Sequence, residues 1–480
     1  MTAFVRRGLA APGLTLMIFA TVCASAGAQV PDDTGAALPS PAVFGGARRQ
    51  QPGTNSLNLT AGLFSGYDTN ILAGDDGGLG AASSTGALGS GDGTGSTFGG
   101  TATTLSWSQQ RARSSYFGQV GAQYRTFFDV DDFNVLSYDA AGGASAQITR
   151  RSTLGVAGSV GVQPFYQFGV LGAVAPRGRV GVESGPGFVP DFQAAREQVL
   201  RYNGGLQYAY ALGPRSAFSA QVSRSGFAPL NSRAEVVGLI NLGATSASAR
   251  LTRRLTANLE GRVGYGYTQF DTVPTRVATL DGGNADNGPI QVGEQRFGTH
   301  DIDVGVDYSR ALTIARRTSF SFGTGSNITR RSGQALGGPA PAVFNVTGFA
   351  TLNRAFLRTW NTGLNYGRAT SYVEGFNEFG VFDSASAFVG GLFTDRLDGS
   401  AGLQYVHGRL GGGGRDELST LGAGAQLRYG ISSNLAAFVS YTYARFGLPD
   451  NPQLQASTLA FRPERQGVRV GLTLWLDLLR

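Results

Sequence analysis

Apolar and polar residues alternate with a period of two along most of the chain after residue 56. In one clear stretch, Val263 and Tyr265 share one parity, whereas Glu260 and Arg262 share the other. Such alternation predicts a β-strand with one apolar face and one hydrophilic face. Because the pattern recurs many times, it predicts a sheet that separates two unlike surroundings.

The connections between these stretches alternate between short and long. The short ones are often rich in arginine, as in Thr149–Ser152, Gly213–Ser216 and Thr252–Leu255, whereas the long ones, such as 70–96 and 167–195, are rich in Gly, Asp and Pro. Eight short turns and nine long loops predict eighteen strands, with sixteen as the alternative. An even number of strands, with short turns at one end and long loops at the other, is typical of an outer-membrane β-barrel.

We expect the strands near residues 56–67, 97–108, 114–128, 135–149, 153–165, 197–211, 216–226, 235–251, 255–269, 295–310, 316–328, 342–353, 357–371, 379–394, 398–410, 418–431, 434–446 and 465–478. A soluble β-sandwich would show similar alternation. The loop asymmetry and the aromatic residues near strand ends, such as Tyr267 and Tyr443, favour the all-β transmembrane barrel.

The first 28 residues have the three-part pattern of a secretory signal peptide. Arg6 and Arg7 precede an apolar run over 14–22, and small residues lead to a cleavage site expected after Ala28. We therefore expect residues 1–28 to be a signal peptide, 29–55 a flexible periplasmic lead and 56–480 the barrel. Cys23, the one cysteine of the chain, falls in the signal peptide, so a disulfide framework is excluded.

The composition removes several classes of function. The chain has 73 glycines, only 15% charged residues and no lysine, so its 39 basic residues are all arginines. A phosphate-binding loop that ends in Gly-Lys-Ser/Thr is therefore excluded. The sequence pI of about 9.6 could suggest nucleic-acid binding, but an exported barrel has no access to that partner. No cofactor and no metal site are expected, because the acidic run 129–134 does not have the pattern of a calcium loop.

The hydrophilic parity supplies the residues that we expect to line the pore. They are Gln119, Gln123, Arg125, Arg201, Asn203, Gln207, Asn258, Glu260, Arg262, Asp303, Asp307, Asn361, Asn365, Gln404, Gln426, Arg428 and Arg469. Arginines outnumber acids in this set, and rings of arginine favour anions in pores. The pattern predicts modest anion selectivity, unless these arginines instead pair with the acids and fill the interior.

The two histidines offer little support for an enzyme. His300 and His407 share the apolar parity of their strands, and neither lies in an Asn-His-x-Ser-like segment. A barrel phospholipase would need a nucleophilic serine held by a histidine. A protease built on His300 and Asp301 would need further acids at the rim, so we expect a protein that is not an enzyme.

The two ends of the expected barrel carry distinctive motifs. The first strand ends in Gly66-Tyr-Asp-Thr-Asn70, and the last strand reads Leu474-Trp-Leu-Asp-Leu-Leu-Arg480. These stretches resemble the β-barrel porin 2 family, which implies an outer-membrane barrel associated with export of capsule or exopolysaccharide. The tail resembles the signal that the barrel assembly machinery reads, with Leu474, Trp475, Leu476, Leu478 and Arg480 as its residues.

Three functions remain after these exclusions. The first is a porin-like channel that passes small hydrophilic solutes or a polysaccharide, since barrels of about 16 to 18 strands enclose an aqueous lumen. The second is a barrel plugged by its own loops that acts as a surface or assembly scaffold, and the remote third is a barrel hydrolase. The expected partners are outer-membrane lipids and lipopolysaccharide, the barrel assembly machinery and components of polysaccharide export.

Overall fold

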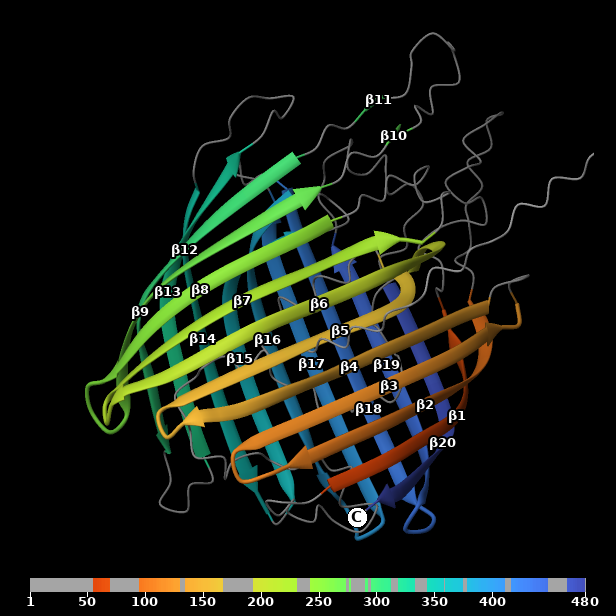
Figure 1. Cartoon of the computed structure of the whole chain (residues 1–480). Helices are drawn as coiled ribbons and strands as arrows, with labels where there is room; N and C mark the ends of the chain where they lie inside the picture. Colours follow the sequence, from red (N-terminus) through yellow and green to blue (C-terminus); the bar gives the residue numbers. More distant parts are fainter. Residues whose placement is uncertain are drawn as a thin grey trace, which may run out of the picture.

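The computed structural model describes residues 55–69, 95–129, 134–166, 193–230, 242–272, 276–277, 290–291, 295–311, 318–332, 343–357, 359–373, 378–410, 416–447 and 464–479. Eighteen of the strands form one antiparallel sheet (Figure 1). None of the described residues forms a helix that is long and apolar enough to cross a membrane. The all-β barrel expected from the sequence is confirmed, with eighteen strands rather than sixteen.

The first half of the barrel consists of β1 (Asn55–Asp68), β2 (Ser96–Gln110), β3 (Ser114–Phe127), β4 (Asn134–Thr149), β5 (Ser152–Tyr166), β6 (Gln193–Gly213), β7 (Ser216–Pro229), β8 (Leu242–Arg254) and β9 (Leu259–Thr272). A separate two-stranded ribbon, β10 (Arg276–Val277) and β11 (Ile290–Gln291), lies in the connection that follows.

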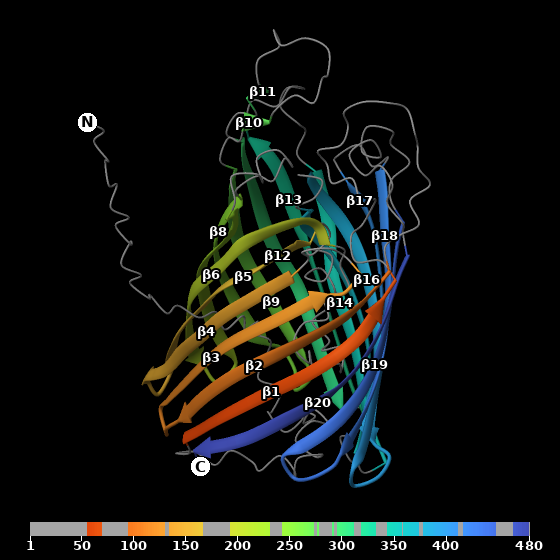
Figure 2. The ribbon, with the colours of Figure 1, turned by 90° about the vertical axis from the view of Figure 1, so that its right-hand side faces the viewer.

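The second half consists of β12 (Gln295–Ala311), β13 (Thr318–Ser332), β14 (Val343–Phe356), β15 (Trp360–Val373), β16 (Glu378–Leu392), β17 (Leu397–Leu410), β18 (Asp416–Gly430), β19 (Leu435–Gly447) and β20 (Glu464–Leu479). Each barrel strand pairs with the next barrel strand, β9 with β12 across the ribbon, and β20 pairs with β1 to close the ring (Figure 2). Closure leaves no free sheet edge, so the backbone groups of the wall bond within the wall.

Three of the short turns are built in the same way. Each has a Ser or Thr whose hydroxyl accepts hydrogen bonds from the two backbone amides two and three residues later, and the residues involved are Thr256, Thr394 and Ser432. Such local side-chain bonds compete with strand pairing and define where it stops. They place one turn at 255–258, three residues beyond the expected turn at Thr252–Leu255.

Alternation gives the wall its two faces. Large apolar side chains such as Leu63, Val120, Val263 and Val304 point outward and are 57–61% exposed. The opposite parity points into the barrel and holds buried polar residues, among them Arg125, Arg262, Asn365 and Ser384. An apolar exterior around a polar interior is the arrangement that a barrel needs to span a membrane.

Candidate functional site: the lumen face

The registers place most of the expected pore residues on the inward face. These are Gln119, Gln123, Arg125, Arg201, Asn203, Gln207, Glu260, Arg262, Asp307, Asn361, Asn365, Gln404, Gln426, Arg428 and Arg469. The backbone of Asp303 pairs with that of Gly264 on the same parity, and its side chain lies outside the described residues.

Asn258 does not line the lumen, so the prediction for this residue is wrong. Its amide donates to the Thr256 hydroxyl inside the short turn, so Asn258 lies at the rim and not on the wall. The period-two pattern of the sequence continues through 255–258, and for that reason alternation alone extends β9 too far. Thr256, whose hydroxyl can bind the amides of this turn, is the sequence signal that would have placed the start of β9 after residue 258.

Arg262 is held in the wall by two partners. Its guanidinium forms an ion pair with Asp307 and donates to the Thr324 carbonyl oxygen at 2.7 Å. The carbonyl lies where the β12–β13 register shifts, between the pairs Ile302–Ser326 and Asp307–Gly323. Such bulges leave backbone groups without a ladder partner. Arg262 therefore stabilises an irregular part of the wall as well as facing the lumen.

Two further ion pairs join inward residues of neighbouring strands. Arg428 on β18 lies 2.5 Å from Asp398 on β17, and Arg465 on β20 makes three contacts of 2.6–3.0 Å with Asp68 on β1. All four side chains are at least 92% buried. Asp68, Asp398 and Arg465 were not among the expected pore residues, although each shares the parity of its inward neighbours.

The structure also adds acids to the lumen face. By register, inward acids among the described residues include Asp68, Asp139, Asp301 and Asp398, besides Glu260 and Asp307. The lumen is therefore richer in acids than the sequence predicts. Arginines pair with acids at Arg262–Asp307 and at Arg428–Asp398, whereas the anion selectivity stays a prediction.

Arginines at the closing seam of the barrel lie against phenylalanine rings. The Arg125 guanidinium is 5.1 Å from the centre of the Phe98 ring, and that of Arg469 is 5.4 Å from Phe64 and 5.2 Å from Phe438. Such contacts are electrostatically attractive. They join β19, β20, β1, β2 and β3 through their inward side chains.

The first-strand motif, residues 66–70, has a physical role at the same seam. A Cβ at Gly66 would lie 2.7 Å from the Phe98 ring and against the Val468 carbonyl oxygen, so no larger residue fits there. Asp68 binds Arg465, and the Thr69 hydroxyl accepts a hydrogen bond from the Gln466 amide at 2.9 Å. The motif thus holds the first strand to the last at the long-loop end.

A cavity of about 610 Å³ lies against the wall where β9 pairs with β12. Its lining comes from β6–β9 and from β12–β15, which approach each other there, and includes Gln207, Gln221, Ser248, Arg250 and Asp301. Amides, hydroxyls and charges of both signs can bind a hydroxyl-rich solute by hydrogen bonds. The cavity thus offers polar groups from several strands to a hydrophilic guest.

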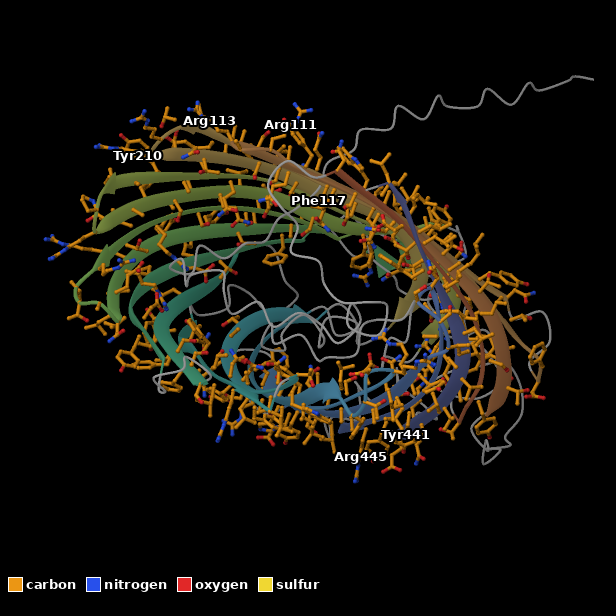
Figure 3. All side chains as sticks on the ribbon, turned by 90° about the horizontal axis from the view of Figure 1, so that it is seen from below. Arg111, Arg113, Phe117, Tyr210, Tyr441 and Arg445 are labelled. Atoms are coloured by element: carbon orange, nitrogen blue, oxygen red, sulfur yellow. The ribbon has the colours of Figure 1, made fainter. Side chains whose placement is uncertain are left out.

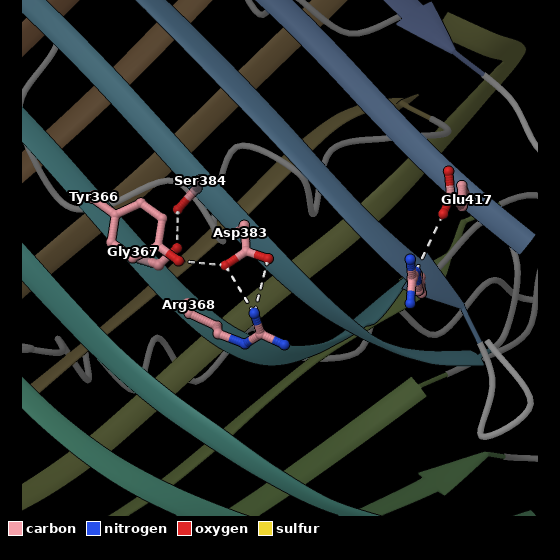
Figure 4. A network of polar contacts seen from close by, with 7 residues as sticks. Tyr366, Gly367, Arg368, Asp383, Ser384 and Glu417 are labelled. Atoms are coloured by element: carbon pink, nitrogen blue, oxygen red, sulfur yellow. Dashed lines mark hydrogen bonds and ion pairs between the residues drawn. The ribbon is translucent and has the colours of Figure 1, made fainter.

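The outer face carries polar groups near the long-loop end of β15–β20. Arg368 lies 3.2 Å from Asp383, which also accepts a hydrogen bond of 2.5 Å from the Tyr366 hydroxyl (Figure 4). Arg409 pairs with Glu417 at 3.2 Å. Polar and aromatic side chains at this level suit the membrane–water interface.

Both histidines lie on the outer face and contact tyrosines. The Nδ1 atom of His300 is 2.8 Å from the Tyr265 hydroxyl, and the His407 ring stacks on Tyr405. Asp301, the neighbour of His300, points to the opposite side of β12. The His300–Asp301 dyad that a barrel protease would use is therefore not assembled.

At the long-loop end, Asp129 receives hydrogen bonds from the backbone amide and the hydroxyl of Thr97, at 2.7 and 2.9 Å. Both bonds hold the pKa of the Asp129 carboxyl below its usual range, and the bond from the backbone amide has the larger effect. Asp129 belongs to the acidic run 129–134, of which 130–133 lie outside the described residues. Its observed role is to fasten the start of β2 to the end of β3.

Comparisons with known proteins give similar barrels at low identity. No protein-family model and no curated protein matches the chain. The solved structures that are similar include OccK11 and OccK2, both of Pseudomonas aeruginosa, the second in complex with glucuronate. Their identities are 14% and 12%, they cover 89% of this chain and 98% and 100% of their own, and the TM-scores are 0.41 and 0.42. The ferric-catecholate import receptor Fiu from Escherichia coli K12 is 9% identical, with 89% and 82% covered and a TM-score of 0.43.

Proposed function

We propose that this protein is an outer-membrane channel whose lumen passes small hydrophilic solutes. The observation that carries the proposal is the pair of unlike faces on one closed wall: apolar side chains outside, and amides, hydroxyls and paired charges inside. Barrels of this strand number enclose a lumen wide enough for water. A polar interior of that width provides a path through which solutes can diffuse.

A polysaccharide is the finer cargo that we propose. The lumen supplies Asn, Gln, Ser and Arg side chains from several strands, and such groups exchange hydrogen bonds readily with sugar hydroxyls. The resemblance of residues 66–70 and 474–480 to the β-barrel porin 2 family supports the same cargo. Export would also require signal-peptide cleavage after Ala28 and recognition of the last strand by the barrel assembly machinery.

Liposome swelling tests the channel. Vesicles that contain the purified protein should swell in isotonic monosaccharide and more slowly as the sugar grows longer, whereas protein-free vesicles should not swell. Vesicles that do not swell in any sugar would contradict an open channel and favour the plugged scaffold. Swelling in monosaccharide without any block by soluble polysaccharide would limit the cargo to small solutes.

A further inference from the structure

The short-turn rim carries an arc of exposed arginines over β2–β9. We define the arginine arc by the turn residues Arg111, Arg113, Arg150, Arg151 and Arg215 and by Arg253 at the end of β8, all of them exposed. No Asp or Glu occurs in the four turn segments of the arc, which are residues 110–114, 149–152, 213–216 and 251–258. Four successive turns therefore present positive charge that no acid of these turns offsets.

The arc borders directly on the apolar exterior. Ile148, Leu212 and Leu251 are 58%, 50% and 47% exposed, and each comes two or three residues before an arginine of the arc. Register places Leu251 and Arg253 on the outer parity of β8. Figure 3 shows Arg111 and Arg113 at the outer edge of the ring, directed away from the lumen.

This order of side chains matches the boundary of a lipid leaflet. The apolar residues contact acyl chains, and the arginines that follow reach the level at which the lipid phosphates lie. Guanidinium groups bind phosphate oxygens in a bidentate manner. A cargo in the lumen would not be reached by side chains that point away from it.

We propose that the arginine arc is a binding surface for anionic phospholipid headgroups in the leaflet on the short-turn side of the membrane. The inference goes beyond the channel and does not require an open lumen. Each arginine close to an anionic lipid surface raises the affinity of the protein for that surface about fivefold. We therefore expect phosphatidylglycerol to gather at β2–β9 in preference to a zwitterionic lipid.

Trp107 provides a reporter next to the arc. It lies on the outer parity of β2, four residues before Arg111, and is 39% exposed. The other two tryptophans of the chain, Trp360 and Trp475, can be replaced by phenylalanine so that the fluorescence comes from Trp107 alone. Quenching by brominated lipids in phosphatidylcholine vesicles then measures which headgroup lies beside this strand.

The test compares brominated phosphatidylglycerol with brominated phosphatidylcholine at equal content. We expect quenching to report about a fivefold or greater preference for phosphatidylglycerol at low salt, decreasing at 0.5 M salt. The preference should disappear when Arg111, Arg113, Arg150 and Arg151 are all changed to Gln, and should persist when they are changed to Lys. The matched control, Arg354→Gln near the end of β14 with Arg396→Gln in the turn between β16 and β17, should keep the preference, and heat-modifiable gel migration verifies that each variant folds.

Equal quenching by the two lipids would overturn the proposal, as would a preference that survives the four Arg→Gln changes. If phosphatidylglycerol is not preferred but soluble polyglutamate binds in a manner that requires the four arginines, the arc is a surface for an acidic soluble partner. That outcome also overturns the lipid assignment. Channel activity in liposomes is measured separately, so its loss cannot be mistaken for loss of lipid binding.

Discussion

The same kind of ion pair occurs on the two faces of the barrel wall in very different surroundings. On the lumen face, the side chains of Arg465 and Asp68 are 5% and 1% exposed. On the outer face, those of Arg409 and Glu417 are 63% and 53% exposed. Burial makes an unpaired charge costly, whereas solvent screens it. The inner pairs therefore hold strands together, and the outer pairs mainly keep a polar surface near the long loops.

The largest expected effect comes from breaking the inner pair at the seam. Asp68→Asn leaves the Arg465 guanidinium buried beside a neutral group, which typically costs about 3 to 5 kcal/mol of unfolding free energy. Urea unfolding followed by gel migration should show a lower midpoint. The double variant Asp68→Asn with Arg465→Gln should recover part of the loss, and a single variant as stable as the parent protein would show that the pair does not hold the seam.

The next largest effect is expected when a new arginine is placed on the outer face but not when it is placed on the lumen face. Val263→Arg puts a cation on the outer face, where it costs about 2 to 4 kcal/mol near the membrane midplane. Ser248→Arg puts the same charge on the lumen face, beside the 610 Å³ cavity, and should be tolerated. Folding yield in vesicles measures both, and equal yields would mean that the assigned faces are wrong.

A smaller effect is expected at the outer pairs. Glu417→Gln removes the partner of Arg409 at an exposed site, where such a pair contributes about 1 kcal/mol or less. The unfolding midpoint should shift little, and the shift should vanish at high salt. A loss as large as that of Asp68→Asn would contradict the contrast between the faces.

The smallest effect is a local pH dependence at the long-loop end. Because hydrogen bonds from Thr97 lower the pKa of Asp129 in the folded protein, the carboxylate stabilises this contact above the unfolded value of about 3.9. That stabilisation is lost as the pH falls through the lowered folded pKa. Amide exchange at Thr97 should therefore lose protection only below about pH 4, and Asp129→Asn should remove this dependence.

Alternation, together with the short and long connections, predicted the number and the approximate positions of the strands, because each residue's face follows from its own parity. It also predicted the inward position of residues such as Arg125, Asn203 and Gln426. It did not reveal partners: the Asp68–Arg465 pair joins residues 397 positions apart and depends on ring closure. The link from Arg262 to Thr324 follows from a register shift that only two paired strands can define.

The turn at 255–258 shows a second limit of alternation. The stretch keeps the period-two pattern of the strand, but the Thr256 hydroxyl binds the amides of Asn258 and Leu259 and ends the pairing. A local hydrogen bond thus overrides the hydrophobic pattern. For this reason Asn258 was wrongly assigned to the lumen.

Chemical modification during single-channel recording tests the central claim most directly. The chain has one cysteine, Cys23 in the expected signal peptide, so an introduced thiol is the sole target in the mature protein. Ser248 and Ala249 are neighbours on β8 that face the lumen and the membrane, respectively. A negatively charged, water-soluble methanethiosulfonate should reduce the current in steps through Ser248→Cys and leave Ala249→Cys unchanged. Equal responses of the two variants, or no current before the reagent is added, would contradict a water-filled lumen.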